Sequence, residues 1–258
     1  MKIIPIKTKR LLKNPLAEIF KIAKKKLKNN DILVITSKII SLEYGGLVNL
    51  KDVVFSQKAK KLAKKYAVSA PFAELVIKES DKILGGVKRA ILTLKSGILM
   101  ANAGIDVSNV PENYVVKLPK NLEKIADQIH TYLLSSQRKS ASSPRLSALG
   151  VVISDSVCLP LRLGTHHYAL AISGFSGIID ERGKKDLFNK PMKITTHNLA
   201  DELASAAGLV MGERSEKIPA VIIRGLPIKF TKLSAKKLTK ELIINRRQDL
   251  FKKVIKLN

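Results

Sequence analysis

The most informative stretch of the sequence is Ile98-Leu99-Met100-Ala101-Asn102-Ala103-Gly104-Ile105-Asp106-Val107-Ser108-Asn109. An apolar run ends abruptly in polar residues and glycine, which predicts a strand that delivers a carboxylate and two amides onto a tight glycine loop. A second stretch, Gly150-Val151-Val152-Ile153-Ser154-Asp155-Ser156, has the same form. Two strands that each end in an aspartate followed by a small polar residue suggest two arms of one metal–phosphate site.

Strand and helix patterns alternate along the chain, which favours an α+β fold of mixed sheets flanked by helices. Strands are expected at 32–36, 149–153, 168–173 and 220–225, and a hairpin at 90–100. Helices are expected at 56–67 with Ser56 as the N-cap, from Pro71 with an apolar stripe through Leu84, and at 121–134, 198–210 and 234–257. We expect residues 1–258 to form one unit, and the Ser-, Lys- and Pro-containing segment 135–147 is where two subdomains would divide.

Composition describes a chain that can bury a core and that has no obvious membrane segment. Of the 258 residues, 45% are hydrophobic, yet no apolar run approaches the roughly 20 residues that a membrane helix needs. The N-terminus lacks the apolar run of a signal peptide. Cys158 is the single cysteine, so it excludes an internal disulfide and is typical of a reducing cytosol. We expect a cytoplasmic protein in which Cys158 is a buried thiol.

The formal net charge of +26 is large, with 47 basic residues against 21 acidic ones. Such a field attracts polyanions, but it also suits a lysine-rich enzyme surface or an anionic small substrate. Aromatic residues make up 5% of the chain and tryptophan is absent, which leaves few platforms for stacked bases. Nucleic acid is therefore a less favoured partner that the charge does not exclude.

Several sequence patterns with known chemistry do not occur. There is no phosphate-binding Gly-x-x-x-x-Gly-Lys-Ser/Thr loop, no His-Glu-x-x-His or Cys-x-x-Cys, and no Gly-x-Ser-x-Gly. Neighbours on a strand point to opposite faces, so His166 and His167 are poor candidates for one metal ion. We expect His130 and His197 to be surface or packing residues.

Four oxygen donors remain as candidates for chemistry: Asp106, Asp155, Ser156 and Glu213. Such ligands suit magnesium or manganese, which commonly bridge nucleotide phosphates. Each aspartate could equally cap a turn. The loop with Asn102, Asp106, Ser108 and Asn109, however, has four polar groups within eight residues of a core strand, which are more than a turn requires. Gly212 is expected to end the helix before Glu213 and so to place Glu213 on a loop.

The chain resembles the coenzyme F420-0:L-glutamate ligase (F420-0 gamma-glutamyl ligase) family over nearly its whole length. The block Asn102-Ala-Gly-Ile-Asp-Val-Ser-Asn109 is its most specific part. The other segments that carry the resemblance are Asp31-Ile-Leu-Val-Ile-Thr-Ser-Lys38, Ile153-Ser-Asp-Ser156, Asp180-Glu-Arg-Gly-Lys-Lys-Asp-Leu-Phe188, Ala200-Asp-Glu-Leu-Ala-Ser-Ala-Ala207, Leu209-Val-Met-Gly-Glu213 and Pro219-Ala-Val-Ile-Ile-Arg-Gly225.

The resemblance implies a GTP-dependent amide ligation. GTP, a co-substrate, would convert an acceptor carboxylate into an acyl phosphate, which the amine of L-glutamate then attacks. Two Mg²⁺ or Mn²⁺ ions, and K⁺ as a further candidate, would serve as cofactors. The resemblance also implies a gamma-glutamyl ligase-like fold and an intertwined homodimer.

Site residues follow from the resemblance by position. Asp106 and Asp155 would be catalytic and hold one metal ion, and Ser156 and Glu213 would contribute to a second. The residues that would contact the nucleotide are Lys7, Thr8, Lys9, Arg10, Ser37, Lys38, Asn109, Met211, Gly212 and Glu213.

The chain departs from the family pattern on its substrate side. Leu42 stands where the family usually has a lysine that contacts nucleotide, and Ser156-Val157-Cys158-Leu159 replaces a usual Thr-x-Gly-Arg. Arg162 is the candidate to bind the anionic acceptor instead. That acceptor is F420-0 or another pterin- or flavin-like acid such as a folate. The third possible function is that of a homologue that binds nucleotide or nucleic acid without catalysis.

Overall fold

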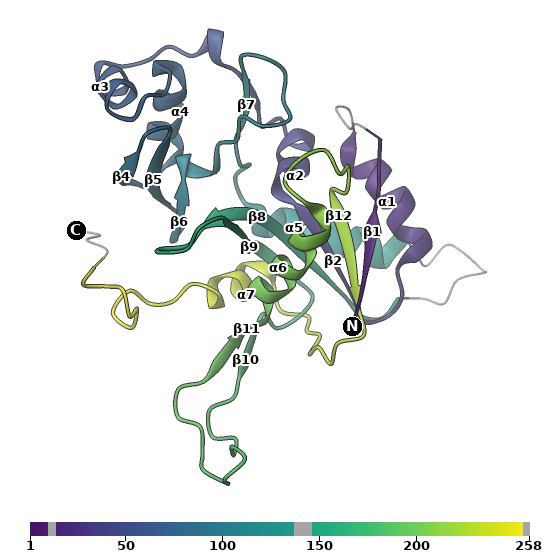
Figure 1. Cartoon of the computed structure of the whole chain (residues 1–258). Helices are drawn as coiled ribbons and strands as arrows, with labels where there is room; N and C mark the ends of the chain where they lie inside the picture. The colour runs from purple at the N-terminus through teal and green to yellow at the C-terminus, as the bar shows by residue number, and fades with distance from the viewer. Residues whose placement is uncertain (10–13, 137–145, 255–258) are drawn as a thin grey trace. The chain divides into compact units, whose positions relative to one another are not determined.

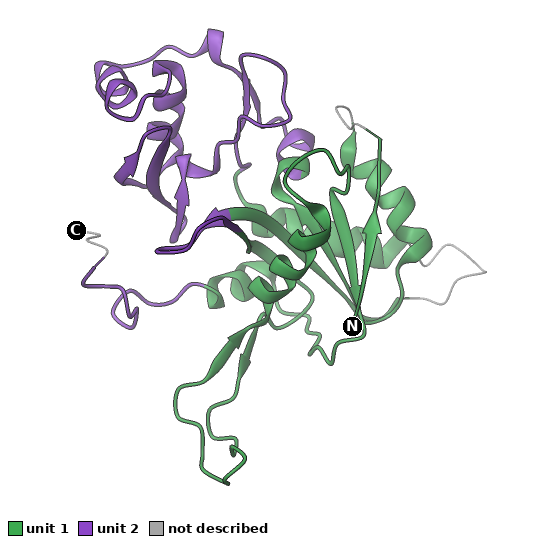
Figure 2. Cartoon of the chain, viewed as in Figure 1, with its two compact units in different colours: residues 1–39, 120–156, 166–242 green, residues 40–119, 157–165, 243–258 purple. Residues whose placement is uncertain are grey.

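The computed structural model describes residues 1–9, 14–136 and 146–254, and the chain divides into two compact units (Figure 2). Unit 1 comprises 1–39, 120–156 and 166–242, and unit 2 comprises 40–119, 157–165 and 243–258. The expected subdomain boundary at 135–147 falls mostly on 137–145, outside the described residues, and the residues on either side of it belong to unit 1. The predicted α+β class is confirmed.

A five-stranded sheet forms the centre of unit 1 (Figure 1). Its strands, in spatial order, are β1 (Lys2–Ile6), β12 (Ala220–Arg224), β2 (Asp31–Thr36), β8 (Leu149–Cys158) and β9 (Thr165–Ser173). β12 runs antiparallel to both β1 and β2, whereas β2 and β8 are parallel. The sheet is therefore mixed.

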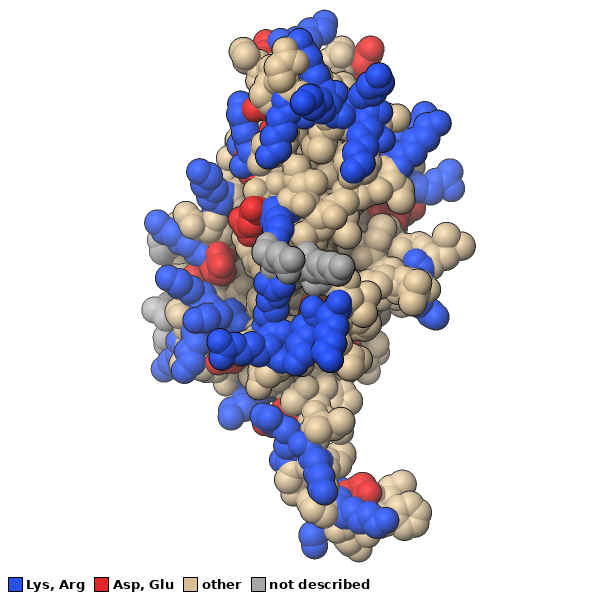
Figure 3. Space-filling view, turned by 90° about the vertical axis from the view of Figure 1, so that its left-hand side faces the viewer, with Lys and Arg blue, Asp and Glu red and all other residues tan. Residues whose placement is uncertain are grey.

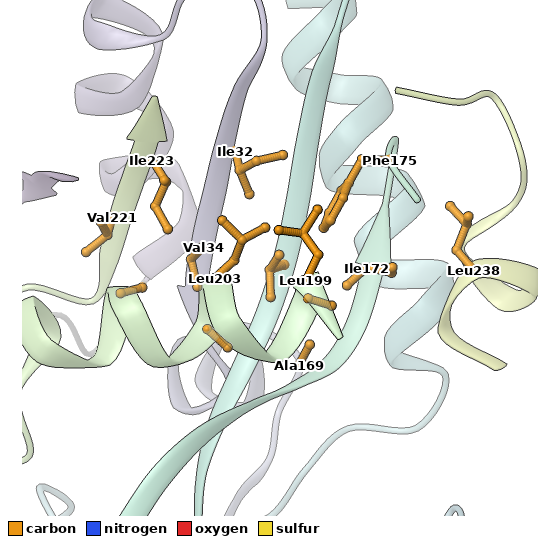
Figure 4. Close-up of a cluster of buried hydrophobic side chains, with 14 of the residues drawn as sticks. Ile32, Val34, Ala169, Ile172, Phe175, Leu199, Leu203, Val221, Ile223 and Leu238 are labelled. Carbon is orange, nitrogen blue, oxygen red and sulfur yellow. The ribbon is translucent and has the colours of Figure 1, made fainter. Parts of the chain in front are cut away.

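β2 forms because its β-branched and aliphatic side chains can be buried on both faces of the sheet. Ile32 and Val34 belong to a core cluster with α6 (Leu199–Met211), which covers one face (Figure 4). Leu33 and Ile35 alternate with them and are fully buried on the opposite face. A continuous apolar run is what a strand covered on both sides requires.

The helices of unit 1 flank this sheet (Figure 1). They are α1 (Pro15–Lys26), α5 (Leu122–Ser136), α6, α7 (Ala235–Glu241) and the start of α2 (Ser37–Glu43). α1 and α5 pack together through the rings of Phe20 and Tyr132, whose centroids lie 5.1 Å apart. As predicted, Gly212 ends α6, and its backbone N–H donates to the carbonyl of Gly208.

A buried ion pair joins the start of β2 to the end of β12. Arg224 donates from Nε to Asp31 Oδ1 and from a terminal guanidinium nitrogen to Asp31 Oδ2, each at 2.7 Å. Asp31 has no exposed surface, and its Oδ2 also accepts from the backbone N–H of Lys28 at 2.7 Å. The same guanidinium donates to the carbonyl of Lys26. The pair therefore fixes both strands and the end of α1.

Unit 2 is built from short elements. They are β3 (Leu47–Asn49), η1 (Leu50–Asp52), α3 (Gln57–Tyr66), α4 (Ala70–Glu79), β4 (Lys82–Val87), β5 (Ala90–Lys95), β6 (Ile98–Ala101), η2 (Asn102–Gly104) and β7 (Tyr114–Val116). β4, β5 and β6 form one antiparallel sheet, and β3 pairs with β7. The core contains Phe72 and Val76 of α4, Ile91 of β5 and Val115 of β7.

A two-stranded arm extends from the body of unit 1 (Figure 1). It consists of β10 (Ile178–Asp180), β11 (Thr196–Asn198) and the long connection between them. Leu187, Phe188 and Ile194 on this connection are 82 to 98% exposed. Three large apolar side chains on one projecting segment are unusual for a surface that faces only water.

Several element predictions are confirmed. The hairpin of β5 and β6 forms around Ser96 and Gly97, and Ser56 caps α3 through the backbone N–H of Ala59. The helix expected at 121–134 is α5, and the helix expected at 198–210 is α6. Among the described residues, no helix combines the length and apolar character needed to cross a bilayer.

Two helix predictions are wrong in extent. Leu84 lies in β4 because α4 ends at Glu79, and the N–H of Asp81 donates to Leu94 of β5 instead. The helix expected at 234–257 ends at Glu241. Beyond it, Asn245 and Asp249 accept from backbone N–H groups two residues ahead, which stabilises turns in place of a helix.

Two predictions about β8 are also wrong. Asp155 does not follow the strand but lies within it, because β8 continues to Cys158 and has β9 as a neighbour in the sheet. Cys158 is exposed rather than buried, since it is the last residue of β8 and lies beyond the part of the strand that the core covers.

Replacing Arg224 with methionine should lower the free energy of unfolding by about 3–5 kcal/mol, because the carboxylate of Asp31 would remain buried without a positively charged partner. Urea denaturation followed by circular dichroism measures this change. Arg182→Met is the matched control, because Arg182 makes a similar two-bond contact with Asp180 on the exposed arm. The control should leave the midpoint unchanged, and equal effects of the two variants would contradict a special role for the buried pair.

Gly104 and Gly45 separate backbone strain from steric overlap in unit 2. Both have φ of +72°, but a Cβ on Gly104 would lie 2.5 Å from Leu118 Cδ1, whereas a Cβ on Gly45 meets nothing within 4 Å. Gly45→Ala should therefore cost about 1 kcal/mol of unfolding free energy, and Gly104→Ala clearly more, at least about 2 kcal/mol. Thermal unfolding of both variants checks this order, which equal losses would contradict.

Candidate functional site

Four of the segments predicted to bind nucleotide or metal lie at one edge of the sheet of unit 1. Thr36, the last residue of β2, pairs with Ser154 of the parallel strand β8. Ser37-Lys38 and Asp155-Ser156 therefore leave this pair at the same edge. β12 begins there as well, because Ala220 pairs with Ile35 of β2.

The remaining two segments reach the same edge through β12. Ala220 also pairs with Ile6, the last residue of β1, so Lys7, Thr8 and Lys9 continue from there. The backbone N–H of Thr8 donates to the carbonyl of Lys217 at 2.9 Å, and that of Thr36 donates to Pro219 at 3.0 Å. The 211–219 loop is thus held against both neighbouring segments.

The loop after α6 has its own internal structure. Gly212 has φ of +68°, and a Cβ there would overlap the carboxyl group of Glu216. Glu216 Oε2 accepts from the backbone N–H of Arg214 at 2.9 Å. Glu216 therefore folds back over the turn, and no sequence pattern predicted this contact.

Asp155 and Ser156 are both half-buried, and Asp155 Oδ1 accepts from the backbone N–H of Ser156 at 3.0 Å. Val152 belongs to the core cluster beneath α6, so the alternation of a strand places Ser154 and Ser156 on the α6 face and Asp155 on the other. The Oγ of Ser154 is buried without a hydrogen-bond partner among the described residues. The side chains of Asp155 and Ser156 therefore lie on opposite faces of the sheet.

Glu213 lies on the exposed loop and contacts His167 of β9. Its Oε1 is 3.2 Å from His167 Nε2, and the two side chains are 53% and 12% exposed, respectively. His167 is not among the residues predicted for the site, because neighbours on a strand point to opposite faces and His166 and His167 are poor candidates for one metal ion. The structure instead pairs His167 with a predicted ligand, whereas His166 is exposed.

Basic side chains accompany this edge. Lys7, Lys9 and Lys217 are exposed on its segments, and Lys38 is half-buried. Lys and Arg also outnumber Asp and Glu across the molecular face in Figure 3. Such a surface favours an anionic ligand such as a nucleotide phosphate.

Asp106 and Asn109 belong to unit 2, where they follow η2. Asn102 Oδ1 accepts from the backbone N–H of Ile91 at 2.8 Å, and Thr93 Oγ1 accepts from that of Ala103 at 3.0 Å. These bonds fix the start of the loop. The predicted tight glycine loop is confirmed, but the side chain of Asn102 is used to bind the backbone N–H of Ile91. Thr93 is a buried contributor that sequence reasoning missed.

Asp106 has the geometry of a turn-capping residue. Its Oδ1 accepts from the backbone N–H of Ser108 at 2.7 Å, and its Oδ2 lies 3.1 Å from Ser108 Oγ. Its own backbone pairs with Val116 of β7. Asn109 is exposed with φ of +55°. Turn capping and metal binding are compatible, because a carboxylate in such a turn can bind a cation as well.

The other predicted residues fall in different surroundings. Arg10 lies outside the described residues. Arg162 is exposed on the segment between β8 and β9, and Leu42 is half-buried in α2. His130 is partly buried and packs against Gly174, and His197 is about half exposed beside Glu202. Both histidines fit their predicted surface or packing roles.

The donors in unit 1 fit a hard divalent ion, because Asp155, Ser156 and Glu213 offer oxygen atoms only. Among the described residues, the structure contains no group of three or more His, Cys, Asp and Glu that could hold a metal ion. Magnesium does not need such a group when one or two carboxylates act together with substrate phosphates.

Comparisons with known proteins identify the relatives of this chain. A family model described as F420-0:Gamma-glutamyl ligase matches residues 1–225. The Coenzyme F420:L-glutamate ligase of Methanocaldococcus jannaschii is 35% identical over 232 residues, which cover 90% of this chain and 88% of that protein. Proteins with the same name from Methanopyrus kandleri and Archaeoglobus fulgidus are 33% and 31% identical, and each alignment covers 88% of this chain and 87% and 89% of the relatives, respectively. The chain is an enzyme of the ligase class and belongs to the F420-0:Gamma-glutamyl ligase family.

Proposed function

We propose that this protein forms an amide bond between L-glutamate and an acidic acceptor of the coenzyme F420-0 type, with GTP and a divalent metal ion. The acceptor carboxylate attacks the γ-phosphoryl group of GTP, and GDP leaves. The amine of L-glutamate then attacks the acyl carbon of the acyl phosphate, and inorganic phosphate leaves as the amide bond forms. Relatives named as F420:L-glutamate ligases support the reaction class.

The observation that carries the nucleotide part of the proposal is the convergence at one edge of the unit 1 sheet. The residues there are Lys7, Thr8, Lys9, Ser37, Lys38, Asp155, Ser156 and the 211–219 loop with Glu213. Lys38 is suited to a phosphate as a point charge, and exposed lysines beside it strengthen the field. Ligands of mixed sheets commonly bind where parallel strands end.

In unit 1, Asp155, Ser156 and Glu213 would supply oxygen ligands for Mg²⁺ or Mn²⁺. In unit 2, Asp106 would supply a carboxylate to a metal ion. Bound there, the ions would neutralise charge on the phosphate oxygens. The opposite directions of Asp155 and Ser156 along β8 agree with two separate sites. K⁺ remains a candidate additional ion. Arg162, on its exposed segment, is the proposed contact for the anionic acceptor.

The projecting arm supports a homodimer. Leu187, Phe188 and Ile194 expose apolar surface that a second copy of the chain would cover. An arm that extends from the body of its own unit is suited to an intertwined assembly.

Acceptor-dependent release of GDP tests the ligase activity directly. The purified chain is mixed with GTP or ATP, Mn²⁺ or Mg²⁺, and L-glutamate, and then with F420-0 or a folate. We expect GDP and phosphate only when both glutamate and F420-0 are present, with mass spectrometry of the acceptor showing one added glutamate. Turnover with folate alone would identify the folate ligase instead. No turnover with either acceptor, together with salt-sensitive RNA binding, would contradict the enzyme proposal.

Asp106→Asn separates turn capping from metal binding. Asparagine keeps an oxygen that can accept from Ser108, so the turn persists while the charge is lost. We expect turnover to fall at least about 100-fold with an unchanged melting temperature, because an ion would lose a ligand. Asp249→Asn is the matched control, since Asp249 caps a turn of the same unit. Full activity of the Asp106 variant would contradict the metal assignment.

The arm variant Leu187→Ser/Phe188→Ser should shift the protein from dimer to monomer. Sedimentation velocity distinguishes one 28.4 kDa chain from two. Leu250→Ser is the control, because Leu250 is 86% exposed but lies outside the arm. A wild-type monomer, or a variant that remains dimeric, would contradict the role of the arm.

A further inference from the structure

His167 is held unusually firmly for a residue near an exposed loop. Its ring lies against the backbone of α6 at Gly208, where any Cβ would overlap Cδ2, Cγ and Nε2 of the imidazole. Glycine inside a helix is destabilising relative to alanine. At position 208 it is explained by the His167 ring, which occupies the space that a Cβ would need. The ring and the helix are therefore fitted to each other.

Two further bonds fix the backbone around His167. Ser205 Oγ of α6 donates to the carbonyl of His167 at 3.0 Å. Two residues along β9, the N–H of Ala169 donates to Asp201 Oδ1 of α6 at 2.9 Å. α6 therefore holds β9 at His167 and two residues beyond it, and this scaffold helps to set the direction of Nε2.

The fixed ring faces the carboxylate of Glu213. Glu213 is half exposed on the loop after α6, and its Oε1 lies 3.2 Å from His167 Nε2. An ionised carboxylate only accepts hydrogen bonds, so Nε2 carries the proton of this contact. A rigid donor thus faces a carboxylate on an exposed loop.

The second ring nitrogen argues against a purely structural role. Nδ1 is buried and has no hydrogen-bond partner among the described residues. A buried polar atom without a partner costs free energy, and an apolar side chain of similar volume would fill the space without that cost. The contact of Nε2 with Glu213 therefore explains why an imidazole stands at this position.

We propose that His167 is a positioning residue that orients the Glu213 carboxylate toward the metal–nucleotide ligand of this sheet edge. The inference rests on the proposed function, because Glu213 acts there as an oxygen donor. Partners that orient metal ligands in this way commonly contribute strongly to metal affinity.

The test measures Mn²⁺ binding to the full-length chain in the presence of GDP, by the electron paramagnetic resonance signal of free Mn²⁺, and so needs no turnover. His167→Leu should weaken Mn²⁺ binding about 10- to 100-fold. His167→Gln, whose amide N–H can replace Nε2–H, should restore affinity to within about 3-fold of wild type. His166→Leu is the matched control on the adjacent exposed residue and should change affinity less than about 2-fold.

A double variant identifies Glu213 as the route of the effect. His167→Leu added to Glu213→Gln should weaken Mn²⁺ binding no further than Glu213→Gln alone, because the group that His167 orients has lost its charge. Circular dichroism melting verifies that each variant is folded.

Wild-type affinity of a folded His167→Leu variant would overturn the inference, and so would a His167→Gln variant as weak as His167→Leu. Additive losses in the double variant would overturn it too. If the wild-type chain itself binds no Mn²⁺ with GDP, the proposed function fails first and this inference fails with it.

Discussion

The ion pair between Arg224 and Asp31 is the interaction on which the arrangement of unit 1 depends. It joins the end of β12 to the start of β2, with the aspartate fully buried. A slip of one residue between these strands would turn every side chain of β2 to the opposite face. The same register brings the ends of β1, β2 and the start of β12 to the opposite edge of the sheet, where the predicted nucleotide segments lie.

Much of this fold could be predicted because local patterns and tertiary structure agree. The apolar run at 32–36 predicts the strand β2, and Ser56 and Gly212 predict helix ends. The loop with Gly104 follows a strand, as its sequence predicts. The candidate site was found in part for the same reason, since polar residues directly after core strands have a limited number of structural explanations. Family resemblance supplied the roles that geometry alone left open.

Other features could not be predicted because they depend on contacts distant in sequence. The length of β8 is set by pairing with β9, so Asp155 stays in a strand that appeared to have ended. The C-terminal segment has helical composition, yet Asn245 and Asp249 stabilise turns instead. His167 could be interpreted only once β9, α6 and the loop of Glu213 were placed together. A glycine at 208 inside a helical pattern was the single sequence signal for that arrangement.

Hydrogen–deuterium exchange with and without GDP and Mn²⁺ shows directly whether this sheet edge binds the nucleotide. Backbone amides report on each segment separately, whatever the acceptor is. If the nucleotide binds there, exchange should become slower at 7–9, 37–38, 155–156 and 211–219. Unchanged exchange in these segments, with protection confined to other parts of the chain, would contradict it.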